Sequence, residues 1–208
     1  LINDEKKTES FSLIDWYMNN ENTKKLNIKY VFHNKNVSEF IHGNTKISYR
    51  KNLFPRLDIH KYVTFFLHSI ILVFIAFIGI FVGRWYYPLL LKDSILNTYV
   101  KYCRKELLAK QYLFDNSNFV YRPMWTYEVE KKGLDIVCYF FSTNCREIEF
   151  DTKDSSIGWG YGAMNWPIYY VWDKYQKNFI EQISDYKKKI LTCGPIYFLD
   201  NFINLEKK

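Results

Sequence analysis

The side chains that could do acid–base chemistry are unevenly distributed along this chain. All four histidines lie within the first 68 of the 208 residues, and the rest of the chain contains none. Histidine is the most common general base, and it activates the nucleophile in Ser-His and Cys-His pairs. No such pair can form within the histidine-free part, so we predict no catalytic residue there.

Two pairs of glutamates are the remaining candidates for acid–base catalysis. Glu128 and Glu130 alternate along a predicted strand, as do Glu147 and Glu149, so each pair shares one face. Two carboxylates on one face can supply a general acid and a general base. A solvated strand face has the same pattern, and we interpret both pairs in that way. The sequence therefore indicates a chain that is not an enzyme.

No pattern typical of a metal or cofactor site occurs either. The segment Gly158-Trp159-Gly160-Tyr161-Gly162 lacks the Gly-Lys-Ser/Thr end of a P-loop and the third glycine of a dinucleotide fingerprint. The spacing of the cysteines does not fit a zinc site, and no histidine follows them. They are Cys103, Cys138, Cys145 and Cys193. We expect no cofactor and no metal, and the sequence leaves open whether Cys138 and Cys145 form a disulfide or are buried thiols.

The strongest pattern in the chain is an apolar run from Tyr62 to Val82. About twenty residues of α-helix rise roughly 30 Å, which is the thickness of the hydrocarbon layer of a membrane. About fifteen Val, Ile, Leu and Phe side chains favour insertion by roughly 5 to 9 kcal/mol at most, on a scale of about −0.3 to −0.6 kcal/mol each. The run therefore predicts a transmembrane helix.

Small side chains occupy one face of this predicted helix. Ser69, Ala76, Gly79 and Gly83 fall within an arc of roughly 80° at 100° per residue, and the last two form a small-xxx-small pattern. Such a face allows close approach of a second membrane helix, and we predict that it packs on another subunit. His68 lies near this face, where we expect it to bond a neighbouring helix or to reach the interface, with a haem ligand or a proton path as the alternative.

We predict an α+β fold in which a single transmembrane helix precedes a small α+β domain. Residues 1–60 form a polar N-terminal segment that favours small hairpins, with a turn at His42-Gly43-Asn44. Residues 61–87 form the transmembrane helix with its interfacial flank, and residues 88–208 form the α+β domain. Within that domain the patterns predict helices over 92–114 and 167–189, and strands over 126–130, 134–141 and 145–150.

Charge and aromatic content indicate a lipid partner rather than a nucleic acid. The net charge is +7, but Lys and Arg are spread along the chain beside 22 acidic residues. Basic and aromatic side chains flank the apolar run, where they could hold anionic lipid such as cardiolipin. These residues are Arg56, Lys61, Arg84, Trp85 and Lys92. Lys and Arg are more frequent before the run than after it, which favours the N-terminal segment on the matrix or cytoplasmic side and the C-terminal domain in the intermembrane space.

The composition carries a resemblance to a known class of proteins. Lys, Asn, Ile, Phe and Tyr, which have AT-rich codons, are abundant, and the mixed-charge start LINDEKKTES is unlike an import presequence. With its one apolar run, the chain resembles divergent single-span proteins encoded in AT-rich protist mitochondrial genomes. That resemblance implies a non-catalytic accessory subunit of the respiratory chain in the mitochondrial inner membrane, bound to other membrane subunits. The alternatives are a membrane-region subunit of the ATP synthase and a membrane-anchored bacterial transferase that acts on surface polysaccharide.

Overall fold

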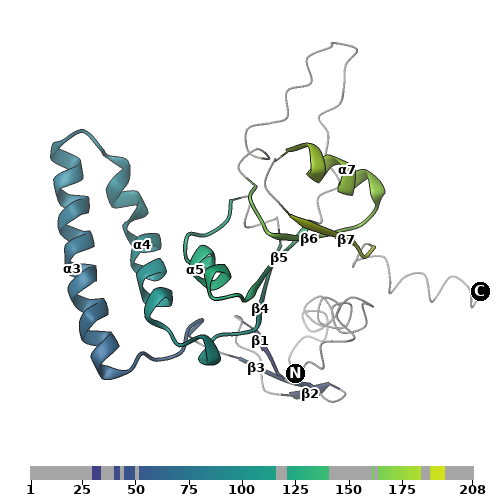
Figure 1. Cartoon of the computed structure of the whole chain (residues 1–208), viewed down its shortest axis with the longest axis horizontal. Coiled ribbons are helices and arrows are strands. Elements are labelled where there is room, and N and C mark those ends of the chain that lie inside the picture. Colours follow the sequence, from purple (N-terminus) through teal and green to yellow (C-terminus); the bar gives the residue numbers. More distant parts are fainter. Residues whose placement is uncertain are drawn as a thin grey trace, which may run out of the picture. The chain divides into compact units, whose positions relative to one another are not determined.

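The computed structural model describes residues 30–33, 40–42, 45–49, 52–115, 121–140, 161, 164–183 and 188–194. The chain divides into two compact units, Phe54–Thr192 on the one hand and Leu1–Leu53 with Cys193–Lys208 on the other. The described residues combine helices with a small parallel sheet, which is an α+β arrangement, and one of the helices is long and apolar (Figure 1).

Two antiparallel helices form a hairpin at one side of the larger unit (Figure 1). The first, α3, covers Ile59–Phe81, and the second, α4, covers Tyr86–Tyr102. Gly83 lies in the turn between them at φ +75°, a conformation that favours glycine. Pro88 falls in the first turn of α4, where its missing N–H removes no hydrogen bond. The helix that the sequence predicted over 92–114 therefore begins earlier and ends earlier.

The sheet of the larger unit has four parallel strands in the order β4-β5-β6-β7. Parallel neighbours need crossover connections, and two helices lie in these connections. Helix α5 covers Trp125–Lys131 between β4 and β5, and α7 covers Lys174–Ile183 between β6 and β7. The strands are β4 (Gln111–Asp115), β5 (Asp135–Phe140), β6 (Ile168–Val171) and β7 (Lys189–Thr192), and a short 3-10 helix, η1 (Lys105–Leu107), precedes β4.

One predicted element has the wrong type and another is correct only in part. The strand predicted over 126–130 is part of α5, and the helix predicted over 167–189 contains β6, α7 and the start of β7. Gly133, at φ +70°, ends α5 through its N–H bond to the carbonyl of Glu130, so the expected hairpin turn is a helix C-cap. Strand β6 is mostly buried and shows no alternation, because a parallel strand can be covered on both faces.

Of the two remaining predicted strands, one is confirmed and the other lies outside the described residues. The strand predicted over 134–141 is β5, in which every residue after Asp135 is buried. Residues 145–150 lie outside the described part of the chain.

The core of the larger unit joins the hairpin to the sheet. Its helices and sheet follow one another as α3, α4, α5 and then the strands (Figure 1). Trp125 on α5 contacts the rings of Phe54, Tyr112 and Phe114 at centroid distances of 4.9, 5.2 and 5.7 Å. Phe114 in turn lies 5.0 Å from Trp166. One cluster of aromatic rings therefore connects the segment before α3 with the sheet.

The smaller unit contains a second sheet, with strand order β1-β3-β2. These strands are β1 (Tyr30–His33), β2 (Phe40–His42) and β3 (Thr45–Tyr49). Strand β2 pairs antiparallel with β3, on either side of the turn that the sequence predicts, whereas β1 pairs parallel with β3.

The burial of Cys103 at the end of α4 predicts an unreactive thiol. Burial raises its pKa from 9.0 to about 11, against the opposing effect of the Lys132 and Lys61 charges. At pH 8 its thiolate fraction should be about 100-fold below that of an ordinary cysteine, because two pKa units separate them. Maleimide labelling followed by peptide mass spectrometry should show slow modification that accelerates above pH 10.

A cysteine introduced at the exposed position of Lys105 provides the matched control. The variant Lys105→Cys should be labelled rapidly at pH 8 on the new thiol and slowly on Cys103. Since the folded pKa is the higher one, the contribution of Cys103 to stability is complete below pH 9 and is lost as the pH rises through about 11. Equal labelling rates of the two thiols at pH 8 would contradict the prediction.

Candidate functional site

The small-residue face of α3 packs on α4 of the same chain over part of its length. Ala76 and Gly79 are the buried residues of α3, and Ser69 is half-buried. Ser69 donates to the carbonyl of Phe65 within its own helix at 2.9 Å. Gly83 lies beyond the helix end, in the exposed turn, with open space where a side chain would be. Ala76 and Gly79 thus face α4 of the same chain, and packing of this face on another subunit stays a prediction.

Gly79 lies directly against Tyr87 of α4. A Cβ atom added there would lie 2.8 Å from Cδ2 and 2.9 Å from Cβ of Tyr87 on α4. Those distances are shorter than van der Waals contact, so the ring of Tyr87 occupies the place that a larger side chain would need. The absence of a side chain at Gly79 lets the turn between α3 and α4 close tightly.

His68 also finds its partner on α4. Its Nδ1 lies 3.1 Å from the hydroxyl of Tyr102 and 3.0 Å from the carbonyl of Thr64. A single ring nitrogen can accept the Tyr102 proton or donate its own to Thr64, according to the tautomer. The sequence predicted a bond to a neighbouring helix, and the neighbour is the second helix of the hairpin.

The residues predicted to bind lipid headgroups divide between the two ends of the hairpin. Arg56 and Lys61 lie at the start of α3, whereas Arg84 and Trp85 lie in the turn at the other end. The Arg84 guanidinium donates to the hydroxyl of Tyr87. Lys92 is exposed on α4. The base and the tip of the hairpin thus each carry cationic side chains.

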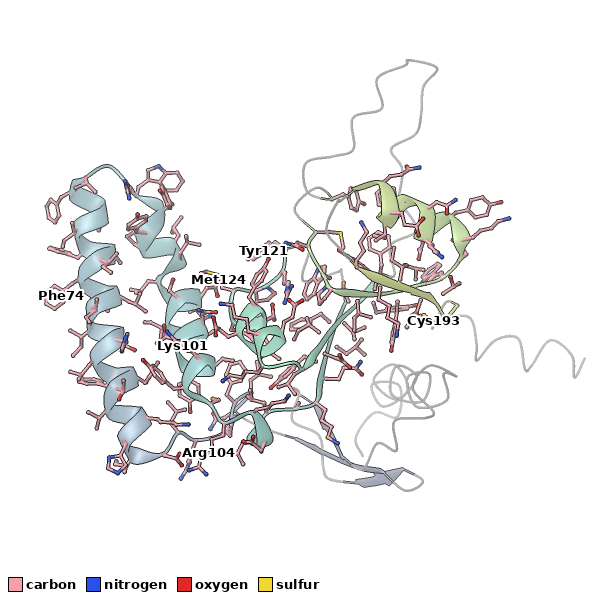
Figure 2. The ribbon with its side chains drawn as sticks, viewed as in Figure 1. Phe74, Lys101, Arg104, Tyr121, Met124 and Cys193 are labelled. Atoms are coloured by element: carbon pink, nitrogen blue, oxygen red, sulfur yellow. The ribbon has the colours of Figure 1, made fainter. Side chains whose placement is uncertain are left out.

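The outward face of α3 is apolar and exposed along its whole length. By length and composition, α3 is the one helix in the described part of the chain that could cross a membrane. The side chain of Phe74 points away from α4 (Figure 2) and is 61% exposed, and Phe66 and Phe77 are also more than half exposed. A core helix of a water-soluble domain would be largely buried, so this face requires an apolar environment.

The strand face predicted to carry Glu128 and Glu130 is wrong, because both residues lie on helix α5. Because Thr126–Glu130 is helical, Glu128 and Glu130 point in different directions and have different partners. Glu128 forms a salt bridge with Lys131 at 2.7 Å, and Glu130 forms one with Arg122 at 2.5 Å. Glu147, Glu149 and the glycine segment 158–162, apart from its half-buried Tyr161, lie outside the described residues.

The buried side chain of Arg122 is a feature that the sequence analysis missed. Its Nε donates to Oγ1 of Thr126 at 2.8 Å, and its guanidinium lies 4.0 Å from the ring centroid of Tyr127. It also bonds the carbonyl of Asn165, just before β6. A lone Arg-Pro step before a short helix carries no signal for such burial. Arg122 is therefore a structural tie between α5 and the sheet, with its donors already engaged.

The carboxyl ends of the four parallel strands meet at one edge of the sheet. In open α/β sheets ligands bind beyond this edge at the point where the strand order reverses, and the described order β4-β5-β6-β7 shows no reversal. Asp115 is the last residue of β4, in register with Tyr139 of β5, and Asp173 follows β6. Oδ1 of Asp173 accepts the N–H groups of Tyr175 and Gln176 at 2.9 Å each, so it caps α7. Asp115 is placed at this edge by the backbone pairing of β4 with β5.

Among the described residues, no group of three or more His, Cys, Asp or Glu side chains is placed so that it could hold a metal ion.

Comparison with known proteins identifies a family. The model described as "Polysaccharide biosynthesis PFTS motif protein" matches residues 65–207, which is more than half of the chain. No curated protein and no solved structure matches the chain.

The contact between Gly79 and Tyr87 predicts that Gly79→Ala changes the free energy of unfolding in opposite directions with and without the Tyr87 ring. In the native chain Gly79→Ala should lower the free energy of unfolding by about 1 to 3 kcal/mol, because the new methyl group overlaps the ring. With Tyr87→Ala present, the same change should raise it by up to about 1 kcal/mol through helix propensity. Thermal unfolding in detergent measures both, and a Tm unchanged by Gly79→Ala in the native chain refutes the tight contact.

The ion pair of Arg122 predicts unequal effects of two similar substitutions on α5. Glu130→Gln should cost about 3 to 5 kcal/mol of stability, because it leaves a guanidinium of 0% exposure without its counter-charge. Glu128→Gln breaks a salt bridge whose Lys131 side chain is 71% exposed, and should cost less than about 1 kcal/mol. Denaturant unfolding of the two variants checks the difference, and equal losses contradict it.

Proposed function

The chain belongs to the family of polysaccharide biosynthesis PFTS motif proteins, and from that premise we propose that it is a membrane-bound glycosyltransferase. In this proposal α3 holds the chain at a membrane, and the carboxyl edge of the parallel sheet binds an activated sugar. The substrate class is a sugar joined to a phosphate leaving group, such as a nucleotide sugar.

The extent of the family match supports a single functional unit. Residues 65–207 include most of α3 together with α4, α5, α7 and the whole four-stranded sheet. The residues that match the family thus include both most of the apolar helix and the parallel sheet. Polysaccharide chains are commonly extended at membrane surfaces, and an exposed apolar α3 suits that location.

The position of Asp115 is the observation that carries the chemical part of the proposal. It ends β4 at the carboxyl edge of the parallel sheet, beside β5. A carboxylate at that edge can accept the proton of an acceptor hydroxyl as its oxygen bonds to the sugar and the sugar–phosphate bond breaks. Such a base needs no histidine.

The accessory-subunit role expected from composition stays a prediction. Neither the family nor the described residues bear on a mitochondrial inner membrane, a respiratory complex, an ATP synthase or cardiolipin. Blue-native electrophoresis of solubilised membranes separates the two roles. Comigration with a respiratory complex would favour the subunit, and a separate band with glycosyl-transfer activity would favour the present proposal.

Two aspartates at opposite edges of the sheet provide a matched test. Asp115→Asn should lower the rate of nucleotide release from a nucleotide-sugar donor by about 10²- to 10⁴-fold, the usual contribution of a general base. Asp135→Asn, at the amino end of β5, should leave the rate unchanged. The assay uses the full chain in membranes with uridine, guanosine and cytidine nucleotide sugars, and unfolding curves show whether both variants fold.

Failure can take two forms in this experiment. If none of the donors releases nucleotide above the rate without protein, the proposed function is refuted. If release occurs but both variants behave alike, the family-level function stands and Asp115 is not the base.

A further inference from the structure

We infer that α3 does not cross the membrane alone: the α3–α4 hairpin enters the bilayer from one side, and the segment before α3 lies on the same side as the sheet. This inference rests on the membrane location proposed above. It differs from the single crossing that the sequence predicts, which would separate these two parts.

Three different contacts hold the two ends of the hairpin together. The ring of Phe54 contacts Trp125 at 4.9 Å, and the hydroxyl of Tyr99 donates to the carbonyl of Pro55 at 2.8 Å. Beside them, Asp58 and Arg104 form a salt bridge at 2.6 Å. Arg104 lies at the end of the hairpin where α3 begins (Figure 2).

A lone crossing is incompatible with these contacts. Helix α3 has 23 residues, so its ends are about 34 Å apart at 1.5 Å per residue. If the chain stayed on the far side after α3, residues 99–125 would be separated from residues 54–58 by about that length. The return of α4 along α3 removes the separation, with Phe65 and Tyr99 in contact at 5.1 Å partway along.

Lipid is the occupant that fits the outward face of α3, whereas α4 carries the exposed Lys92 and the half-buried Asp93. No Asp, Glu, Lys or Arg occurs between Tyr62 and Gly83, and Phe74 on the outward face is 61% exposed. The apolar surface continues around the tip, where Trp85 is 70% and Leu89 69% exposed. Trp is enriched at membrane interfaces, and the Arg84–Tyr87 bond shields the one charge of the turn.

The base of the hairpin has the charge that an anionic lipid surface attracts. Residues 52–61 and 101–110 contain six Lys or Arg against two Asp or Glu. The basic residues are Arg56, Lys61, Lys101, Arg104, Lys105 and Lys110, and all but the half-buried Lys61 are exposed. This distribution places the headgroups at the base, next to the segment before α3 and the start of the sheet domain.

Terminal tags on the full chain test the sidedness. Each tag follows a cleavage site for a specific protease, and the chain is expressed in cells from which sealed membrane vesicles of known orientation are prepared. We expect the two tags to be cleaved together in vesicles of one orientation and to be protected together in the other. Cleavage of one tag with protection of the other would overturn the inference.

Photoactivatable phosphatidylcholine in the same vesicles tests the occupant. Mass spectrometry should find lipid adducts on the outward face of α3 and around Trp85, and none on the exposed Tyr175 of α7. Adducts on α3 with tags on opposite sides would refute the hairpin and leave the membrane location standing. Absence of adducts together with release of the chain by alkaline carbonate would refute the membrane location itself.

Discussion

Packing of α3 against α4 is the contact on which the larger unit depends. Helix α3 is apolar on every side, so any surface that α4 does not cover requires another apolar environment. The contact is possible because Gly79 leaves room for the ring of Tyr87 and because Gly83 lets the chain reverse. Once the chain has reversed, α4 presents Val100 and Cys103 to the core that it shares with α5. The hairpin thereby orders the start of the sheet domain.

Some parts of this arrangement can be predicted from sequence because one dominant signal specifies them. The run from Tyr62 to Val82 yields α3 with its ends shifted by one to three residues, since no other structure accommodates so many consecutive apolar side chains. Strand β5 is predictable for the same reason, being a short apolar run after a glycine. The small-residue stripe of α3 is also visible in the sequence, and so is most of α4, although its predicted start at residue 92 lies six residues too late.

Other parts escape prediction because local patterns are ambiguous. Thr126–Glu130 alternates like a strand, and only the buried contacts of Trp125 and Val129 make it helical. Residues 168–171 fall in a region with helical periodicity, and the pairing with β5 and β7 decides for a strand. Tertiary pairing of this kind overrides local preference. The candidate site depends on this strand pairing, because only the assembled sheet places Asp115 at the edge where the four strands end.

The ring cluster around Trp125 gives the protein a mechanical property. Phe54, Trp125, Phe114 and Trp166 form an uninterrupted series of contacts from the residues before α3 to the residue two positions before β6. Close-packed interiors transmit displacement rather than absorb it. At the membrane location proposed above, a tilt of α3 would be conveyed along these rings to β4, so that the sheet would respond to the thickness of the surrounding bilayer.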